Sequence, residues 1–192
     1  VLAEATEFAH KRIARELSKD VWVCAPETEQ SAASHSLTLH QPLRVRKASR
    51  RRFAIAGTPT DSVLLAIHDL IDGKSPDLVL SGVNRGANMG QETVFSGTVG
   101  GAMTGMLLGI PSIAMSQVFT SGQPVDWDAS RTLAPGVITR LLEIGWPQDV
   151  CLNINFPPVK AAAAGPLTLT RQGIGWIEGM RVETRTDLRN NN

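Results

Sequence analysis

The chain has 192 residues, with 19 basic and 18 acidic side chains and a formal net charge of +1. This length favours one folded domain, and the near-neutral balance gives no electrostatic argument for a nucleic acid or an anionic membrane as partner. Hydrophobic residues make up 42% of the chain, which excludes an extended disordered polymer. No apolar run reaches the roughly 18 residues of a membrane span. Cys24 and Cys151 lie in apolar segments and no secretory signal pattern is visible, so we expect reduced thiols and a cytoplasmic protein.

Helix and strand patterns alternate along the first third of the chain. An apolar repeat every four residues predicts a helix over residues 4–18, and the apolar run at residues 21–26 predicts a buried strand. Two β-prone segments around a basic tip, residues 43–46 and 53–56, predict a hairpin. Thr58 is a candidate N-cap, and the proline and aspartate that follow it are typical of a helix start.

The same alternation continues toward the C-terminus. The predicted elements are strands at residues 77–82, 111–116, 151–156 and 167–170, and helices at 96–109 and 126–145, the last kinked or broken at Pro135-Gly136. Strands that alternate with helices imply parallel pairing, with helices on both faces of the sheet. We therefore expect an α/β fold in a single domain over residues 1–192. Its architecture would be a Rossmann-like, doubly wound three-layer sandwich with a mostly parallel sheet and a small β-hairpin.

The loop at residues 81–90 is the most informative candidate site. Ligands of doubly wound folds bind beyond the carboxyl ends of the strands, and this loop directly follows a predicted buried strand. Asn84 and Asn88 offer amide groups that suit a hard cation or a phosphate oxygen. A turn-rich connector would explain the same glycines and asparagines equally well.

Ser96, Gly97 and Thr98 stand at the predicted start of the next helix. Unpaired backbone N–H groups, two hydroxyls and a residue without a side chain would suit an anion such as phosphate. Simple N-capping by Ser96 is the plainer explanation. The chain has neither the Gly-Lys-Ser/Thr of a Walker loop nor a dinucleotide fingerprint at a strand-to-helix turn.

Two further segments carry polar side chains that suit chemistry. After the first predicted strand, Ser31 and Ser34 could bind a ligand, and His35 could be a general acid or base, although a solvated histidine is commoner. Residues 44–52 hold six basic side chains. They could contact the phosphates of a nucleic acid, but a solvated hairpin face is the commoner explanation.

Taken together, these motifs resemble the SurE survival-protein family. The resemblance rests on residues 23–31, 34–38, 57–62, 81–90, 96–99 and 152–157, and covers about residues 12–158. It implies a nucleotidase that releases phosphate from nucleoside 5′- or 3′-monophosphates with a divalent ion, Mg²⁺ or Mn²⁺, as a homodimer or homotetramer. Ser31 and Asn84 match metal ligands of the family. Asn88, Ser96, Gly97 and Thr98 match positions around the phosphate.

The acidic pair that the family supplies to the metal from an Asn-Asp-Asp-Gly loop has no counterpart here, since no Asp-Asp occurs in the chain. The chain starts at Val1 rather than at a methionine, so we expect the metal loop and a C-terminal arm to be missing from it. The catalytic residues therefore stay unassigned. Two neutral ligands hold Mg²⁺ or Mn²⁺ poorly. A phosphate- or nucleotide-binding module without catalysis is thus the alternative hypothesis, and nucleic-acid binding through residues 44–52 ranks third.

Overall fold

A computed structural model describes residues 13–173 of the chain. Its strands are β1 Val23–Pro26, β2 Val45–Ser49, β3 Arg52–Ile55, β4 Val79–Arg85, β5 Ser112–Gln117 and β6 Leu152–Phe156. Its helices are α2 Pro59–Leu65, α3 Gly97–Leu107 and α4 Asp128–Ile144. Short helical turns are η1 Ala66–Leu70, η2 Gly90–Phe95 and η3 Ala161–Ala163. Residues 13–17 are also helical, and the rest of the helix predicted from residue 4 lies outside the described residues.

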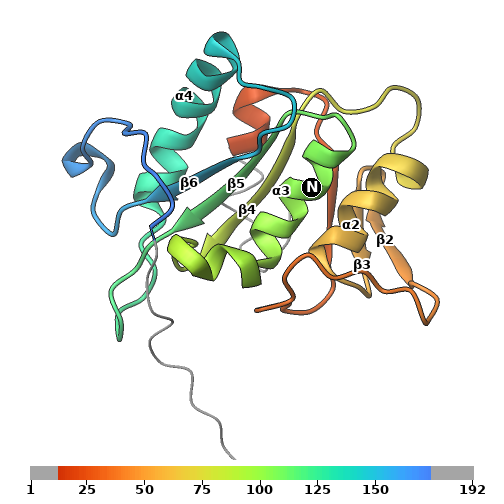
Figure 1. The fold of residues 1–192 in the computed structure, drawn as a ribbon. Coiled ribbons are helices and arrows are strands. Elements are labelled where there is room, and N and C mark those ends of the chain that lie inside the picture. Colours follow the sequence, from red (N-terminus) through yellow and green to blue (C-terminus); the bar gives the residue numbers. More distant parts are fainter. Residues whose placement is uncertain (1–12, 174–192) are drawn as a thin grey trace, which may run out of the picture.

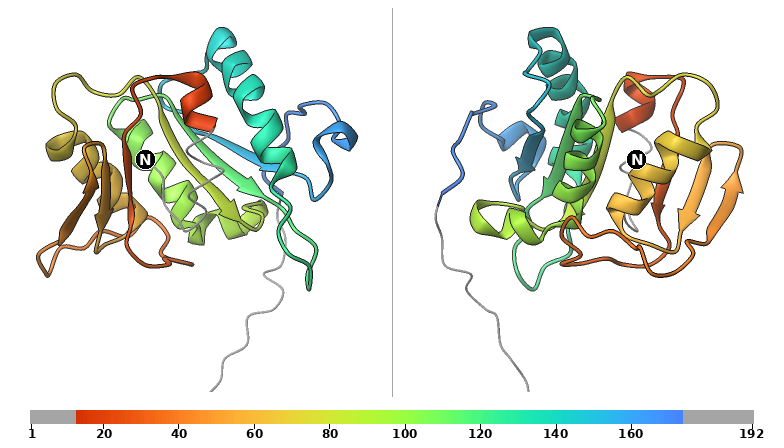
Figure 2. Two further views of the ribbon diagram at one scale, coloured as in Figure 1. Left: turned by 180° about the vertical axis from the view of Figure 1, so that it is seen from behind. Right: turned by 45° about the vertical axis from the view of Figure 1, so that its right-hand side comes forward.

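The strands pair in two three-stranded sheets, in the orders β1-β3-β2 and β4-β5-β6. In the first sheet β1 runs parallel to β3, while β2 and β3 form the predicted antiparallel hairpin. All pairing in the second sheet is parallel. The helices α2 and α3 lie side by side on one face of the strands, and α4 with residues 13–17 lies on the other (Figures 1 and 2). The predicted mostly parallel, three-layer α/β fold is confirmed.

Side chains of β5 alternate between the two helical layers. Ile113 and Met115 pack in one cluster with Ala134 and Ile138 of α4, whereas Ala114 packs with Val99 and Ala102 of α3. Every residue of β5 is buried. A strand covered on both faces explains why Ile113, Ala114 and Met115 are apolar at consecutive positions instead of alternating with polar residues.

Two helix starts follow the sequence closely. The Thr58 hydroxyl accepts from the Asp61 N–H at 3.1 Å, and the Asp61 carboxylate accepts from the Thr58 N–H at 2.8 Å, which completes a capping box at α2. At α3 the Ser96 hydroxyl accepts from the Val99 N–H at 3.1 Å. Both predicted N-caps are confirmed.

Two predicted features differ from the structure. The helix α4 runs unbroken from Asp128 to Ile144 with Pro135 inside it, so the predicted break is wrong; its buried residues on both sides of Pro135, such as Ser130 and Ile138, favour a continuous helix. Residues 167–170 form no strand within the described part of the chain. Leu169 there is 98% exposed, so its apolar side chain meets no sheet face that would stabilise an extended segment.

Gly136→Ala is expected to raise the free energy of unfolding by about 1 kcal/mol, because alanine is the better helix former. Gly136 lies inside α4, and a methyl group added there would meet no atom within 4 Å. Gly145 is the matched control: its site is equally open, but its φ of +73° disfavours any side chain. Gly145→Ala should therefore lower the same free energy. Urea unfolding measures both, and equal signs would contradict the argument.

Candidate functional site

The loops after β1, β4 and β5 share one edge of the molecule. Because β4, β5 and β6 run parallel, their carboxyl ends lie at one edge of their sheet, and Figure 1 shows η2 and the start of α3 at the same end. Loop 27–38, which follows β1, reaches this end as well. The Ser34 N–H donates to the Phe95 carbonyl at 3.0 Å, and the Ser34 hydroxyl donates to the Val94 carbonyl at 2.6 Å.

Asn88 is the centre of a hydrogen-bonded cluster of polar side chains. The residue is 6% exposed, and its Nδ2 donates to the Ser116 Oγ at 2.7 Å. Its backbone N–H donates to the Asn155 Oδ1 at 2.9 Å. Its carbonyl accepts from the Nδ2 atoms of Asn153 and Asn155 at 2.8 Å and 3.0 Å. Asn88 therefore ties the loop after β4 to β5 and β6, and its amide nitrogen is already engaged.

Asn84 lies beside this cluster near the end of β4. The strand register places it opposite Ser116, and its Nδ2 donates to the Gly86 carbonyl at 3.1 Å. In the part of the chain that the structure describes, its Oδ1 accepts no hydrogen bond. Asn84 thus offers one amide oxygen at the edge of the sheet, while Ser116 lies close to both asparagines.

The first turn of α3 supplies hydrogen-bond donors to this end of the molecule. Ser96 caps the helix, and the N–H groups of Gly97 and Thr98 belong to the first turn, where the helix leaves such groups without intrahelical partners. Gly97 is buried, and a methyl group there would lie 3.0 Å from the Pro59 Cγ and 3.4 Å from the Gln30 carbonyl oxygen. The missing side chain thus allows α3 to approach Pro59 of α2, while the contact with loop 27–38 would remain of ordinary length.

Ser31 lies in loop 27–38, directly after Gln30. The residue is exposed, and its hydroxyl donates to the Glu29 Oε1 at 3.0 Å. Within residues 13–173 no hydrogen bond joins Ser31 to Asn84. The residue before Ser31, Gln30, approaches Gly97 at the start of α3, while Asn84 and Asn88 both lie at Ser116.

His35 does not face this edge. Its Nε2 is 3.0 Å from the Thr104 Oγ1 on the third turn of α3, where the side chain is partly buried. The backbone around it lies against α3, since a methyl group on Gly100 would be 3.1 Å from the His35 Cα. The contact makes His35 a packing residue of α3 rather than a proton donor or acceptor at the sheet edge.

Comparison with known proteins identifies the family of the chain. A family model described as Survival protein SurE matches residues 3–178. The chain belongs to the SurE family. It is 60% identical over 163 residues to the protein named 5'-nucleotidase SurE from Paramagnetospirillum magneticum, a match that covers 85% of this chain and 63% of that relative. It is 52% identical over 179 residues to 5'-nucleotidase SurE 1 from Burkholderia lata, covering 93% and 69%.

A solved SurE structure shares the fold. The crystal structure of the SurE protein from Aquifex aeolicus superposes with a TM-score of 0.81 at 34% sequence identity, covering 90% of this chain and 71% of that one. The present chain spans less than two thirds of the length of the Paramagnetospirillum relative, 63%. Fold and family are therefore established for the chain.

The described residues do not form a site for a hard divalent cation by themselves. No group of three His, Cys, Asp or Glu side chains within residues 13–173 is placed to hold a metal ion. The first carboxylate after β1, that of Glu27, accepts from the Arg46 Nε at 2.9 Å and the Arg44 Nη2 at 3.2 Å. These hydrogen bonds lower the pKa of Glu27 and engage its oxygens. Ser31 and Asn84 offer neutral oxygens, whereas Mg²⁺ and Mn²⁺ are bound mainly through carboxylates.

Sequence reasoning missed the contribution of β6 to this SurE edge. Asn153 and Asn155 hold Asn88 from a strand more than sixty positions away. One signal was visible, since the two asparagines alternate with apolar residues and therefore lie on one face of the strand.

No helix among the residues that the structure describes is long and apolar enough to cross a membrane.

Proposed function

We propose that this SurE-family chain carries the phosphate-binding part of a nucleotidase, a phosphomonoesterase that hydrolyses nucleoside 5′- or 3′-monophosphates to nucleoside and phosphate. The observation that supports the proposal is the meeting of loop 27–38, the end of β4 and the start of α3 at one sheet edge. Two relatives that the chain matches over most of its length are named 5'-nucleotidase SurE.

The residues of this edge suit a phosphate group. The N–H groups of Gly97 and Thr98 at the start of α3 would donate to phosphate oxygens, and the helix end favours negative charge. The Ser96 hydroxyl uses its oxygen to accept from Val99, which leaves its proton for a ligand. Donors that are already oriented cost little to organise when charge develops on the phosphoryl oxygens during hydrolysis.

We further propose that the reaction depends on a divalent ion, Mg²⁺ or Mn²⁺. Ser31 and Asn84 would be neutral donors of such a site, and residues 13–173 hold no group of three acidic, histidine or cysteine side chains that would complete it. When bound, such an ion would activate water and neutralise phosphoryl charge. We also propose that the chain assembles as a homodimer or a homotetramer.

The neutral donor set specifically favours a second candidate function. An edge that presents amide, hydroxyl and N–H groups can bind phosphate without hydrolysing it. The alternative is therefore a phosphate- or nucleotide-binding module without catalysis. It would bind 5′-AMP with an affinity that does not depend on added metal, and would release no phosphate.

Phosphate release from 5′-AMP and 3′-AMP, with Mn²⁺ and with a chelator, tests the proposal. We expect metal-dependent release, and Asn84→Ala should reduce its rate by roughly 100-fold, because an oriented amide oxygen at the reacting centre is lost. Gln148→Ala, which removes an exposed amide after α4, is the matched control and should leave the rate unchanged. Full activity of Asn84→Ala would exclude the assigned role. Binding without turnover in the unaltered chain would favour the binding module.

A further inference from the structure

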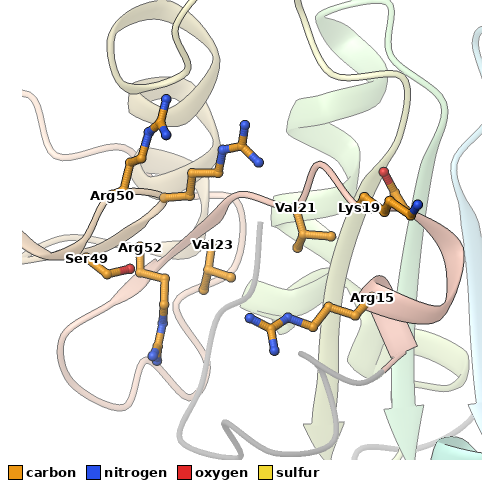
Figure 3. A pocket seen from close by; sticks show the side chains of 9 residues that line it. Arg15, Lys19, Val21, Val23, Ser49, Arg50 and Arg52 are labelled. Atoms are coloured by element: carbon orange, nitrogen blue, oxygen red, sulfur yellow. The ribbon is translucent and has the colours of Figure 1, made fainter.

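A hollow in the surface lies away from the edge described above. It has a volume of about 490 Å³ and is lined by five basic side chains around the start of β1. We call it the basic pocket and define it by Arg15, Lys19, Arg50, Arg51 and Arg52. Figure 3 shows Arg15 and Lys19 on one side, Arg50 and Arg52 on the other, and Val21 and Val23 between them.

The basic pocket is distinct from the proposed nucleotidase edge. Its residues lie before β1, at the start of β3 and in the turn between β2 and β3, so they surround the amino ends of β1 and β3. Loop 27–38 at the carboxyl end of β1 contacts η2 and α3 instead. A ligand in the basic pocket would therefore occupy the opposite end of the first sheet, and this inference does not depend on the proposed nucleotidase activity.

The basic run at residues 44–52 divides into two parts with different partners. Arg44 and Arg46 both pair with Glu27, at 3.2 Å and 2.9 Å, so one carboxylate offsets part of the positive charge there. In the basic pocket the carboxylate of Asp20, itself 69% exposed, pairs with Arg51 at 3.0 Å. Among residues 13–173 no carboxylate pairs with Arg15, Lys19 or Arg50. The positive charge left at the pocket is therefore that of Arg15, Lys19 and Arg50, whereas Arg51 is paired and Arg52 has an interaction partner as well.

The shape and chemistry of the basic pocket restrict the ligand. Guanidinium groups bind phosphate oxygens through paired N–H donors. The volume of about 490 Å³ lies in the usual range for small-molecule sites, whereas a nucleic acid needs an extended basic stripe. Val21 and Val23 are half-buried and give the hollow an apolar wall. We propose that the basic pocket binds a small molecule that carries a chain of phosphates, of the class of inorganic triphosphate or a nucleoside triphosphate.

Calorimetric titration of the chain with inorganic triphosphate and with ATP tests this proposal. We expect both to bind, with an affinity that falls as salt rises. Equal affinities would mean that the phosphate chain alone is bound, and tighter binding of ATP would mean that the nucleoside also contacts the pocket. The double variant Arg15→Gln/Arg50→Gln should lower the affinity at least about 30-fold, because it removes two charge-assisted contacts. Both residues are exposed, so the variant should keep the melting temperature of the unaltered chain.

Two control variants separate the pocket from general charge and from the nucleotidase edge. Arg46 lies in the same basic run but outside the pocket, and Asn84 lies at the other site. Neither Arg46→Gln nor Asn84→Ala should change the affinity for triphosphate. Three results would each overturn the proposal. They are no binding of triphosphate or ATP at low salt, an equal loss for Arg46→Gln and the pocket variant, and loss of binding in Asn84→Ala.

Discussion

Replacing Asp61 with alanine is expected to lower the free energy of unfolding by about 3 kcal/mol. The residue is 2% exposed, and its carboxylate accepts from the Thr38 N–H at 3.0 Å, the Thr38 hydroxyl at 2.7 Å and the Thr58 N–H at 2.8 Å. It therefore joins the start of α2 to Thr38 at the end of loop 27–38. Alanine would leave these donors without their acceptor, and a buried unpaired N–H is costly.

The effect of Asp61 on stability should depend on pH. Burial opposes ionisation, but the hydrogen bonds from Thr38 and Thr58 outweigh it and hold the pKa of Asp61 below the ordinary aspartate value. A carboxyl with a lowered pKa in the folded state stabilises the fold above its unfolded pKa, about 3.9, and this contribution is lost as the pH falls through the folded value. The difference between the unaltered chain and Asp61→Ala should thus be largest at neutral pH and shrink in acid.

Urea unfolding at neutral and at acidic pH measures both expectations for Asp61. Asp69→Ala in η1 is the matched control, because Asp69 is exposed and its removal should change the free energy of unfolding by less than about 0.5 kcal/mol. Equal stabilities of the unaltered chain and Asp61→Ala at neutral pH would show that the capping box contributes nothing. A difference that grows in acid would contradict the lowered pKa.

Local sequence signals predicted the elements and their starts. Thr58, Pro59 and Asp61 mark the start of α2 because capping joins residues that are at most three positions apart. The apolar run of β5 likewise reports burial on both faces without knowledge of its neighbours. Such signals fail where stability depends on a distant partner. The segment at residues 167–170 has an alternating pattern, yet no strand pairs with it in the described part of the chain.

At the candidate edge, too, some features follow from local sequence signals and others depend on distant partners. The position of Asn84 and of the start of α3 follows from the rule that ligands bind at the carboxyl ends of parallel strands. That Asn88 is held by Asn153 and Asn155 could not be predicted, because the strand register across more than sixty residues fixes those contacts. The basic run is a similar case: only the fold shows that Glu27 pairs with Arg44 and Arg46 but not with Arg50.

Gly82→Ala is expected to have the largest effect on the edge, lowering the free energy of unfolding by about 3 kcal/mol or more. Gly82 lies in β4, where the register with β5 shifts between Ser81 and Asn84. Its φ is +118°, which only glycine adopts readily, and a methyl group there would collide with the Met115 carbonyl oxygen of β5. Since that oxygen belongs to the backbone of a buried strand, β4 and β5 would have to separate.

Gly86→Ala isolates the collision from the backbone strain at Gly82. Gly86 has the same φ of +118°, but a methyl group there would come no closer than 3.8 Å to the Asn84 Nδ2 and the Phe119 ring. Gly86→Ala should therefore lower the free energy of unfolding only by the cost of the unfavourable backbone conformation, about 1–2 kcal/mol. Thermal and urea unfolding compare the two variants, and hydrogen exchange of β5 amides would locate the damage, which should reach β5 only in Gly82→Ala. Equal losses for both would mean that the close approach of β4 to β5 does not limit this position, and that Asn84 is held at the edge by backbone conformation alone.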